Sequence, residues 1–304
     1  MFKIKILGCG SALPTSHHLP SAQVVEVRGK LLLLDCGEGV QLQLRHQHLN
    51  LMRIGHVFIT HAHGDHCFGL PGLISTFSLL GRKTPLHVFA PATLQPFFDC
   101  IIDSFCVGMQ YEVTFTPVDP ERCEVVCESS SFRVSSLPLR HRVPCCGYLI
   151  EEQPSLPHIR PEMIAEYDIP HWAINNIKAG ADWTAANGEV ISHERLTRPA
   201  EPPCRYAYCT DTMPNPELPA WIEGVDMLYH EATYAEADAS KATLVGHSTA
   251  TQAAEIARAA HVGRLLIGHF SARYDDETPL LHEAQAIFPA TELADEGLEV
   301  TLRV

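Results

Sequence analysis

Long apolar runs are absent from this sequence. No stretch reaches the roughly 18 consecutive apolar residues that a membrane-spanning helix needs, so a membrane span is excluded. Internal repeats and low-complexity tracts are also absent. The opening residues MFKIKILGCGSALPTS lack the apolar stretch and cleavage site of a signal peptide, which predicts a cytoplasmic location. Hydrophobic residues make up 46% of the 304, enough to exclude disorder and to bury a full core.

Basic residues are scarce. Lysine and arginine total 22 against 36 acidic residues, and the net charge of −14 argues against indiscriminate binding to nucleic acid or anionic membranes. The 11 cysteines have no regular spacing, and the close pairs at 123/127 and 145/146 do not form a zinc-finger framework. We therefore expect mostly free, buried thiols in a reducing compartment. Histidine is abundant at 18 residues, and it is the commonest metal ligand and a frequent acid or base.

Strand-like and helix-like runs alternate along much of the chain. Thr249 and Gln252 have the spacing of a capping box at the start of one helix. The predicted strands are 1–7, 22–27, 30–34, 57–60, 86–90, 111–117, 132–139, 206–209, 227–229 and 265–267. The predicted helices are 41–49, 69–81, about 92–106 and about 249–261.

The segment from residue 151 to about residue 203 differs from the rest of the chain in amino-acid composition. It is polar, dotted with prolines and weakly periodic, and its nine acidic and four basic side chains give a net charge of −5. We interpret it as an arm inserted into a single catalytic domain that spans residues 1–304. The alternative is an ordinary pair of helices packed on the surface.

A cluster of potential metal ligands directly follows an apolar strand, in the sequence THAHGDH at residues 60–66. His61 and His63 can bind one metal ion, and Asp65 and His66 can bind a neighbouring ion. Sites rich in nitrogen with added carboxylate suit zinc, with manganese or iron as substitutes. Packing explains three adjacent imidazoles poorly, so the pattern predicts a metal centre.

The HAHGDH pattern resembles the metallo-β-lactamase superfamily, and three later residues match what that family needs. His141, Asp211 and His269 each follow a strand-like segment, in the expected order. The resemblance implies an α/β fold, a four-layer αββα sandwich with two zinc ions per chain. It also implies the ligand sets: His61, His63 and His141 for the first zinc, Asp65, His66 and His269 for the second, and Asp211 for both.

Four further strings narrow the resemblance: DCGEG at 35–39, HEAT at 230–233, GHST at 246–249 and GHFSARY at 268–274. Together they resemble the ribonuclease Z family, which removes the 3′ trailer from precursor tRNA. The resemblance implies an endoribonuclease that leaves a 3′-hydroxyl on the tRNA and a 5′-phosphate on the trailer. Asp65 would accept a proton from the attacking water, and His247, steadied by Glu231, would protonate the leaving oxygen. The alternatives are a backbone cap for His247 and a partner of a metal-binding histidine for Glu231.

The sequence departs from the family at two places. The loop LPTSHHLPS at 13–21 lacks the lysine and arginine with which many relatives sense the tRNA 3′ end. The arm carries His171 and Trp172 where bacterial members have Gly-Pro, and it is acidic although phosphate contacts favour cations. Trp172 and Trp183 either stack on exposed bases or pack the arm against the body. Lys178 in the arm and Arg273 are candidate tRNA-binding residues.

Two other functions stay open. Another hydrolase of the same fold, such as a small-molecule phosphodiesterase or a lactonase, would use the same ligands, because fold and metal do not fix function. A catalytically idle binding protein is the second alternative, although all seven ligand positions are filled. The HEAT and HST segments and the arm favour precursor tRNA as the substrate. Family resemblance further implies a homodimer in which one chain's arm clamps the tRNA that the other cleaves.

Overall fold

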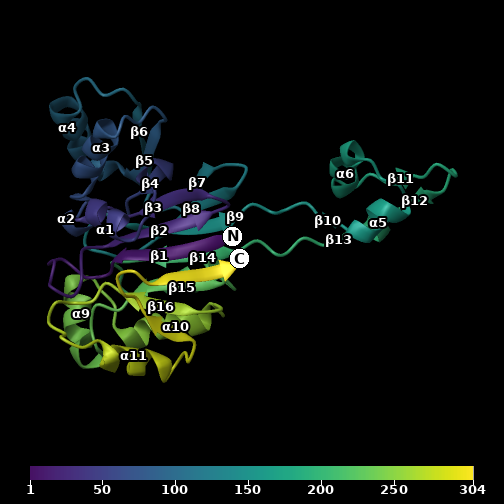
Figure 1. Cartoon of the computed structure of the whole chain (residues 1–304). Helices are drawn as coiled ribbons and strands as arrows, with labels where there is room; N and C mark the ends of the chain where they lie inside the picture. The colour runs from purple at the N-terminus through teal and green to yellow at the C-terminus, as the bar shows by residue number, and fades with distance from the viewer. Residues whose placement is uncertain (304) are drawn as a thin grey trace. The chain divides into compact units, whose positions relative to one another are not determined.

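Two seven-stranded sheets lie face to face in the computed structural model, which describes residues 1–303. They form one compact unit from Met1–Glu152 and the residues from Cys204 onward. Helices cover the outer face of each sheet, so the order of layers is helix, sheet, sheet, helix (Figure 1). The predicted four-layer αββα sandwich is confirmed.

The first sheet contains most of the N-terminal half. Its strands β3 to β6 run parallel, so their carboxyl ends lie along one edge, and β1 pairs antiparallel with both β2 and β18. In spatial order the strands are β18 (Glu299–Arg303), β1 (Phe2–Gly8), β2 (Ala22–Val27), β3 (Lys30–Leu34), β4 (Ile54–Phe58), β5 (Leu86–Pro91) and β6 (Val113–Val118).

The second sheet belongs mainly to the C-terminal half. Its strands β14 to β17 run parallel, and the β7, β8 and β9 side is antiparallel. In spatial order the strands are β17 (Thr291–Leu293), β16 (Leu265–Gly268), β15 (Met227–Glu231), β14 (Arg205–Cys209), β9 (Cys146–Glu152), β8 (Phe132–Pro138) and β7 (Val125–Glu128).

The alternation of side chains along a strand builds two hydrophobic cores. In β3, Leu32 and Leu34 point into the core between the sheets, and Leu31 and Leu33 point into the core under the N-terminal helices. Both faces of this strand are covered, which explains its unbroken run of leucines. The burial of these faces holds the strand ends, and therefore the loops that follow them, in fixed positions.

The helices lie between strands, as alternating segments predict. Pro71 lies in the first turn of α3, where its missing N–H costs nothing, and the predicted capping box of Thr249 and Gln252 is present at α10. The helices of this unit are α1 (Val40–His46), α2 (Gly64–Cys67), α3 (Leu70–Leu79), α4 (Gln95–Phe105), α8 (Leu218–Trp221), α9 (Ala239–Val245), α10 (Ala250–Ala259) and α11 (Thr278–Gln285), with 3₁₀ turns at Leu51–Arg53, Ala92–Leu94 and Glu236–Asp238.

Several predicted elements have wrong boundaries, two of them by three residues at one end. The helix predicted over 41–49 ends at His46, because His48 adopts a left-handed backbone with φ of 55° that an α-helix cannot contain. The strand predicted over 57–60 begins earlier, at Ile54, and ends at Phe58. Thr60 and the residues after it are thereby released from the ladder, and they form the loop and the short helix α2 that carry the histidine cluster.

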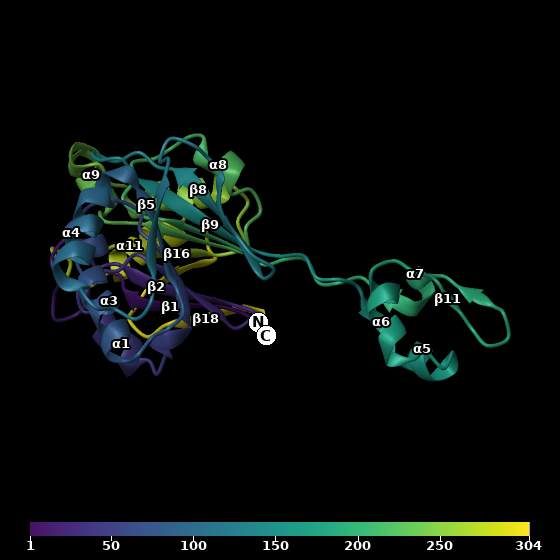
Figure 2. The same ribbon diagram turned by 90° about the horizontal axis from the view of Figure 1, so that it is seen from above.

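Residues Gln153–Pro203 form a second compact unit, with α6 and β11 visible in Figure 2. It has a small core of its own, built around Ile169, Ile177 and Leu196. Trp183 packs into this core and donates its ring N–H to the carbonyl of Tyr167. The elements are β10 (His158–Ile159), α5 (Pro161–Glu166), α6 (His171–Lys178), β11 (Trp183–Thr184), β12 (Val190–Ile191), α7 (His193–Leu196) and β13 (Thr197–Arg198).

All 11 cysteines are free thiols, and eight of them are buried, among them Cys145 and Cys146. Burial raises the pKa of most of these thiols, which keeps them protonated and unreactive. Among residues 1–303, no helix has both the length and the apolar character needed to cross a bilayer.

Candidate metal centre and acid–base pair

The predicted metal-binding side chains converge from the ends of four strands. His61 follows β4, His141 follows β8, Asp211 follows β14 and His269 follows β16. Asp211 and His269 have φ of 52° and 61°, in the left-handed region that non-glycine residues seldom adopt. Such backbone conformations cost of order 1–3 kcal/mol and concentrate at functional sites, because the surrounding structure must enforce them.

Asp211 lies between two groups of histidines and directs one carboxylate oxygen at each. Its Oδ2 is 3.5 Å from His61 Nε2 and 3.8 Å from His141 Nε2. Its Oδ1 is 3.2 Å from His66 Nε2 and 3.0 Å from His269 Nε2. A carboxylate placed in this way can bridge two neighbouring cations.

Each group gathers ligand atoms that lie within 4.8 Å of one another. His63 completes the first group, with Nδ1 2.8 Å from His61 Nε2. Asp65 completes the second, with Oδ2 3.4 Å from His66 Nε2 and 3.7 Å from His269 Nε2. The first group is His61, His63, His141 and Asp211, and the second is Asp65, His66 and His269.

The histidine rings are held by their inner nitrogens. Nδ1 of His66 is 2.7 Å from Asp35 Oδ2, Nδ1 of His141 is 2.8 Å from the carbonyl of Gly246, and Nδ1 of His269 is 2.9 Å from the Thr233 hydroxyl. The Nε2 atoms of these three rings are buried, and within residues 1–303 none makes a well-aligned hydrogen bond, although those of His66 and His269 lie close to Asp211 Oδ1. A buried polar atom without a partner costs about 1–3 kcal/mol, and a metal ion would remove that cost. The donor set therefore fits a metal centre.

Electrostatics also favour a cation in this site. Burial lowers the pKa of His61 well below its usual value, which leaves the ring neutral and able to ligate. Burial opposes ionisation of Asp211, but nearby His269, His66 and His61 hold the pKa of its carboxyl well below the usual range. Burial also opposes protonation of His66, yet the carboxylates of Asp211, Asp35 and Asp65 raise its pKa well above the ordinary value. The negative field that stabilises a proton on His66 would equally attract a metal ion.

His247 and Glu231 form a pair at the edge of the metal-binding groups. His247 Nδ1 is 2.9 Å from Glu231 Oε1, and the carboxylate also accepts the backbone N–H groups of Thr212 and Ser248 and the Thr233 hydroxyl. Glu231 is fully buried, so its charge acts on His247 with little screening. Burial lowers the pKa of His247, but Glu231 outweighs this effect and raises it to about 9. The imidazole is therefore protonated at neutral pH and can donate a proton.

A pocket of about 270 Å³ opens onto these groups and is lined by His63, Asp65, Asp211, His247 and His269. The backbone N–H of Ala12, from the loop after β1, donates to Asp65 Oδ2 at 2.8 Å. A second pocket, of about 450 Å³, shares Ala12, His63 and Asp65 with the first. A chain-like substrate bound across Asp65 would therefore have space on both sides.

The candidate substrate-binding residues have different surroundings. Arg273 forms an ion pair with Asp238, with Nη1 2.9 Å from Oδ1, and its guanidinium lies over the Tyr234 ring. Trp172 and Lys178 belong to the second compact unit, at the two ends of α6. The Trp172 side chain is 73% exposed, with its ring against that of Trp183.

Sequence reasoning missed two residues that build the site. Asp35 accepts hydrogen bonds from Thr60 and Tyr208 in addition to His66. The signal was an acid directly after the apolar strand β3, within the DCGEG string. Thr233, the last residue of HEAT, lies between Glu231 and His269 and contacts both.

Known proteins share both the fold and the chain length. Human tRNase Z, short form, superimposes with a TM-score of 0.71 at 24% identity and covers 99% of this chain and 100% of its own. The metallo-β-lactamase fold protein YhfI from Bacillus subtilis superimposes with a TM-score of 0.70 at 18% identity, covering 98% of both chains. A family model described as anti-Pycsar protein Apyc1 matches residues 2–112.

The two facing sheets have the metallo-β-lactamase fold, and the histidine–aspartate cluster at their edge could hold metal ions. Ribonuclease Z of Parabacteroides distasonis is 52% identical over 301 residues, covering 99% of both chains, and that of Bacteroides fragilis is 50% identical over the same share. This chain belongs to the ribonuclease Z family.

Proposed function

We propose that this chain is a zinc-dependent endoribonuclease that removes the 3′ trailer from precursor tRNA. The observation that carries the proposal is the joint presence of two metal-binding groups and a His247–Glu231 pair around one pocket, in a chain of the ribonuclease Z family. Cleavage would leave a 3′-hydroxyl on the tRNA and a 5′-phosphate on the trailer.

Two zinc ions would be held by the two groups of side chains. Nitrogen and carboxylate donors suit zinc, and manganese or iron are substitutes. Bound there, the ions would lower the pKa of a water molecule and offset negative charge on the phosphate. His61, His63 and His141 would hold one ion, Asp65, His66 and His269 the other, and Asp211 both.

The protein's own groups would move the protons. Asp65 lies beside the site of attack and would accept a proton from the water, while the Ala12 N–H fixes the orientation of its carboxylate. His247 would protonate the leaving 3′-oxygen of the tRNA, because its raised pKa supplies the acid form at neutral pH. Glu231 would orient the imidazole and stabilise its charge.

The unit Gln153–Pro203 is the candidate tRNA-binding arm of the catalytic domain. Exposed Trp172 offers a face for contact with a base, and Lys178 offers a cation. Arg273, held by Asp238, would contact the acceptor end from the body. We further propose a homodimer, so that one chain's arm holds the tRNA that the other cleaves, and a cytoplasmic location, where precursor tRNA is made.

The test is cleavage of an end-labelled precursor tRNA with a short trailer. Wild type should cut after the discriminator nucleotide, and His247→Ala should be slower by a hundredfold or more, in the range of about 10²–10⁴ for a lost general acid. The exposed His261→Ala is a matched control that should behave as wild type. If only a small chromogenic phosphodiester is cleaved, the chain is another hydrolase of this fold and the tRNA assignment is wrong.

A further inference from the structure

Phe68 is an exposed aromatic ring beside the metal-binding groups. It follows α2 directly, two residues after His66, and 62% of its surface is exposed. Single exposed apolar residues are ordinary, but this one lines the second pocket, together with His63 and Asp65. Its position gives that pocket an apolar wall next to the reacting groups.

Two neighbouring residues, Gly64 and Phe97, support the Phe68 ring. A Cβ atom at Gly64 would lie 2.5 Å from the ring, so the ring packs directly on the backbone of the histidine cluster. Phe97 supports it, with ring centroids 6.0 Å apart at a tilt of 45°. A ring that packs on Gly64 and Phe97 and also lines a pocket can serve as a platform on which a flat ligand stacks.

Arg142 supplies the cation of the same pocket. It is the one lysine or arginine among the residues that line the two pockets at the metal-binding groups. It is exposed, and within residues 1–303 it has no hydrogen bond or ion pair that would neutralise it. Its stem packs against Gly246, where an added Cβ would lie 3.2 Å from Arg142 Cγ. A guanidinium placed between the pockets can bind the phosphate that joins two nucleotides.

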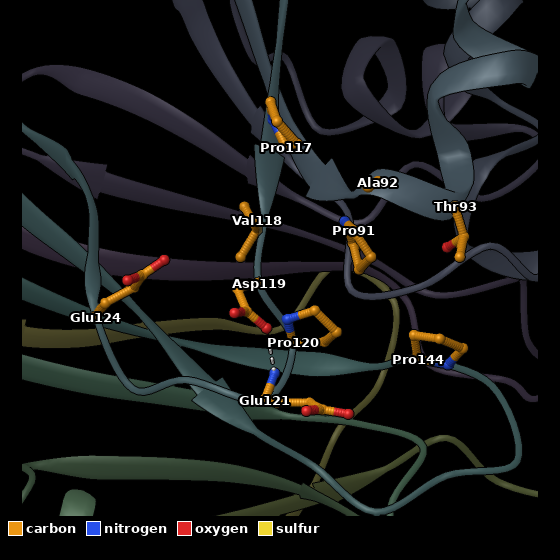
Figure 3. Close-up of a pocket in the computed structure, with 10 residues that line it drawn as sticks. All are labelled: Pro91, Ala92, Thr93, Pro117, Val118, Asp119, Pro120, Glu121, Glu124 and Pro144. Carbon is orange, nitrogen blue, oxygen red and sulfur yellow. Dashed lines mark hydrogen bonds between the residues drawn. The ribbon is translucent and has the colours of Figure 1, made fainter.

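The two pockets differ in their acid–base groups, which orients a bound RNA. His247 lines only the first pocket, so the nucleotide whose 3′-oxygen leaves belongs there. The nucleotide on the other side of the phosphate belongs in the second pocket, beside Phe68. A third pocket, of about 490 Å³, is lined by Pro144 and by the acidic residues Asp119, Glu121 and Glu124 (Figure 3). Its carboxylates, of which Asp119 pairs with Arg122, make this pocket a poor site for a phosphate chain.

We propose that the pocket beside Phe68 receives the first nucleotide of the trailer, with its base stacked on the Phe68 ring and its 5′-phosphate bound by Arg142. The inference rests on the proposed function, and it adds the substrate portion that is recognised downstream of the cut. Stacking tolerates any base, so this contact would hold trailers of different sequence.

The test compares three precursor tRNAs: one intact, one abasic at the first trailer nucleotide and one abasic at the discriminator. We expect Phe68→Ala to lower kcat/KM on the intact substrate about tenfold, within the range for loss of one base–aromatic stack. Phe68→Trp should restore it, and the exposed Phe105→Ala is the matched control. The difference between wild type and Phe68→Ala should vanish on the substrate that lacks the trailer base and persist on the one that lacks the discriminator base.

Arg142→Ala should reduce cleavage of all three substrates by a similar factor, because it contacts phosphate rather than base, and the exposed Arg258→Ala is its control. The inference would be overturned if the effect of Phe68→Ala vanished on the substrate that lacks the discriminator base. It would also be overturned if Phe68→Ala and wild type cleaved the intact substrate at equal rates. Zinc content establishes that the variants are folded. If wild type cleaves no precursor tRNA, the proposed function itself is wrong; if it cleaves while the Phe68 variants do not differ, only this inference is wrong.

Discussion

At the scale of single residues, the two nitrogens of each histidine ring have separate tasks. Nδ1 of His66 meets Asp35 and Nδ1 of His269 meets Thr233, which leaves Nε2 of both rings facing Asp211. The inner contact selects the tautomer and fixes the ring, so the outer nitrogen is presented as a ligand. Residues that do not ligate a metal would therefore influence its affinity.

Replacement of Asp35 tests this dependence. Asp35→Asn removes the charged acceptor that orients His66, so we expect the zinc affinity of the second group to fall about ten- to hundredfold. Competition with a chromogenic chelator would measure the affinity. The exposed Asp99→Asn on α4 is the matched control and should bind zinc as wild type does. Unchanged affinity in Asp35→Asn would mean that the His66 ring is held by its packing alone.

The pKa of His247 gives a prediction on pH. If His247 donates a proton in its acid form, activity is present below its pKa of about 9 and is lost as the pH rises through that value. Glu231→Gln removes the negative charge that raises this pKa, so the alkaline limb of the pH–rate profile should move to lower pH. Single-turnover cleavage over a pH series would measure the position of the alkaline limb. A profile whose alkaline limb stays in place would show that another group titrates there.

At the scale of elements, α10 begins at Ala250, three residues after His247, and its stability depends on the hydrogen bonds of its first turn. Thr249 accepts the N–H of Gln252, and the Gln252 side chain accepts the N–H of Thr249. Thr249→Ala should lower the free energy of unfolding by about 1 kcal/mol, the usual cost of a lost N-cap. Urea denaturation would measure it. Thr249→Ser should retain most of the stability, and Thr243→Ala, at an exposed position on α9, is the control. A midpoint unchanged in Thr249→Ala would mean that packing alone holds this turn.

Some features of these elements can be predicted from the sequence, and others depend on the folded chain. The apolar runs of β2 and β3 and the capping box of α10 are local signals, and the structure contains them at the predicted positions. The end of α1 was missed because the residue in the left-handed conformation, His48, is not a glycine, and glycine is the usual sequence signal for such a turn. The HAHGDH cluster was visible because its ligands are adjacent in sequence. Phe68 and Arg142 were not identified, since only the folded chain brings the two residues to one pocket.

At the scale of the whole molecule, the net charge of −14 must coexist with a polyanionic substrate. The lining of the catalytic pockets contains a single guanidinium, that of Arg142. Affinity for tRNA would therefore have to come from other places, and residues 153–203 form a compact unit separate from the sandwich that could supply it. If this unit binds tRNA as proposed, exposed Trp172 would let it do so through stacking more than through charge.

Deletion of this unit is structurally feasible. Its two ends meet at neighbouring strands, because Glu151 in β9 pairs with Arg205 in β14 and the N–H of Glu152 donates to the carbonyl of Cys204. A short Gly-Ser turn in place of 153–203 would close a hairpin between strands that are already paired. The sandwich should fold and keep its zinc, because no residue of the two metal-binding groups lies in the deleted segment.

The deletion variant should cleave a small phosphodiester at the wild-type rate, since the reacting groups remain. Its KM for precursor tRNA should rise about tenfold or more, as expected when a contact that stacks on a base is removed. Trp172→Ala in the full chain should reproduce part of that rise, and Val190→Ala, exposed in the same unit, is the control for a merely structural effect. A KM unaltered by the deletion would place all tRNA recognition on the sandwich, and the acidic unit would then have no part in binding the substrate.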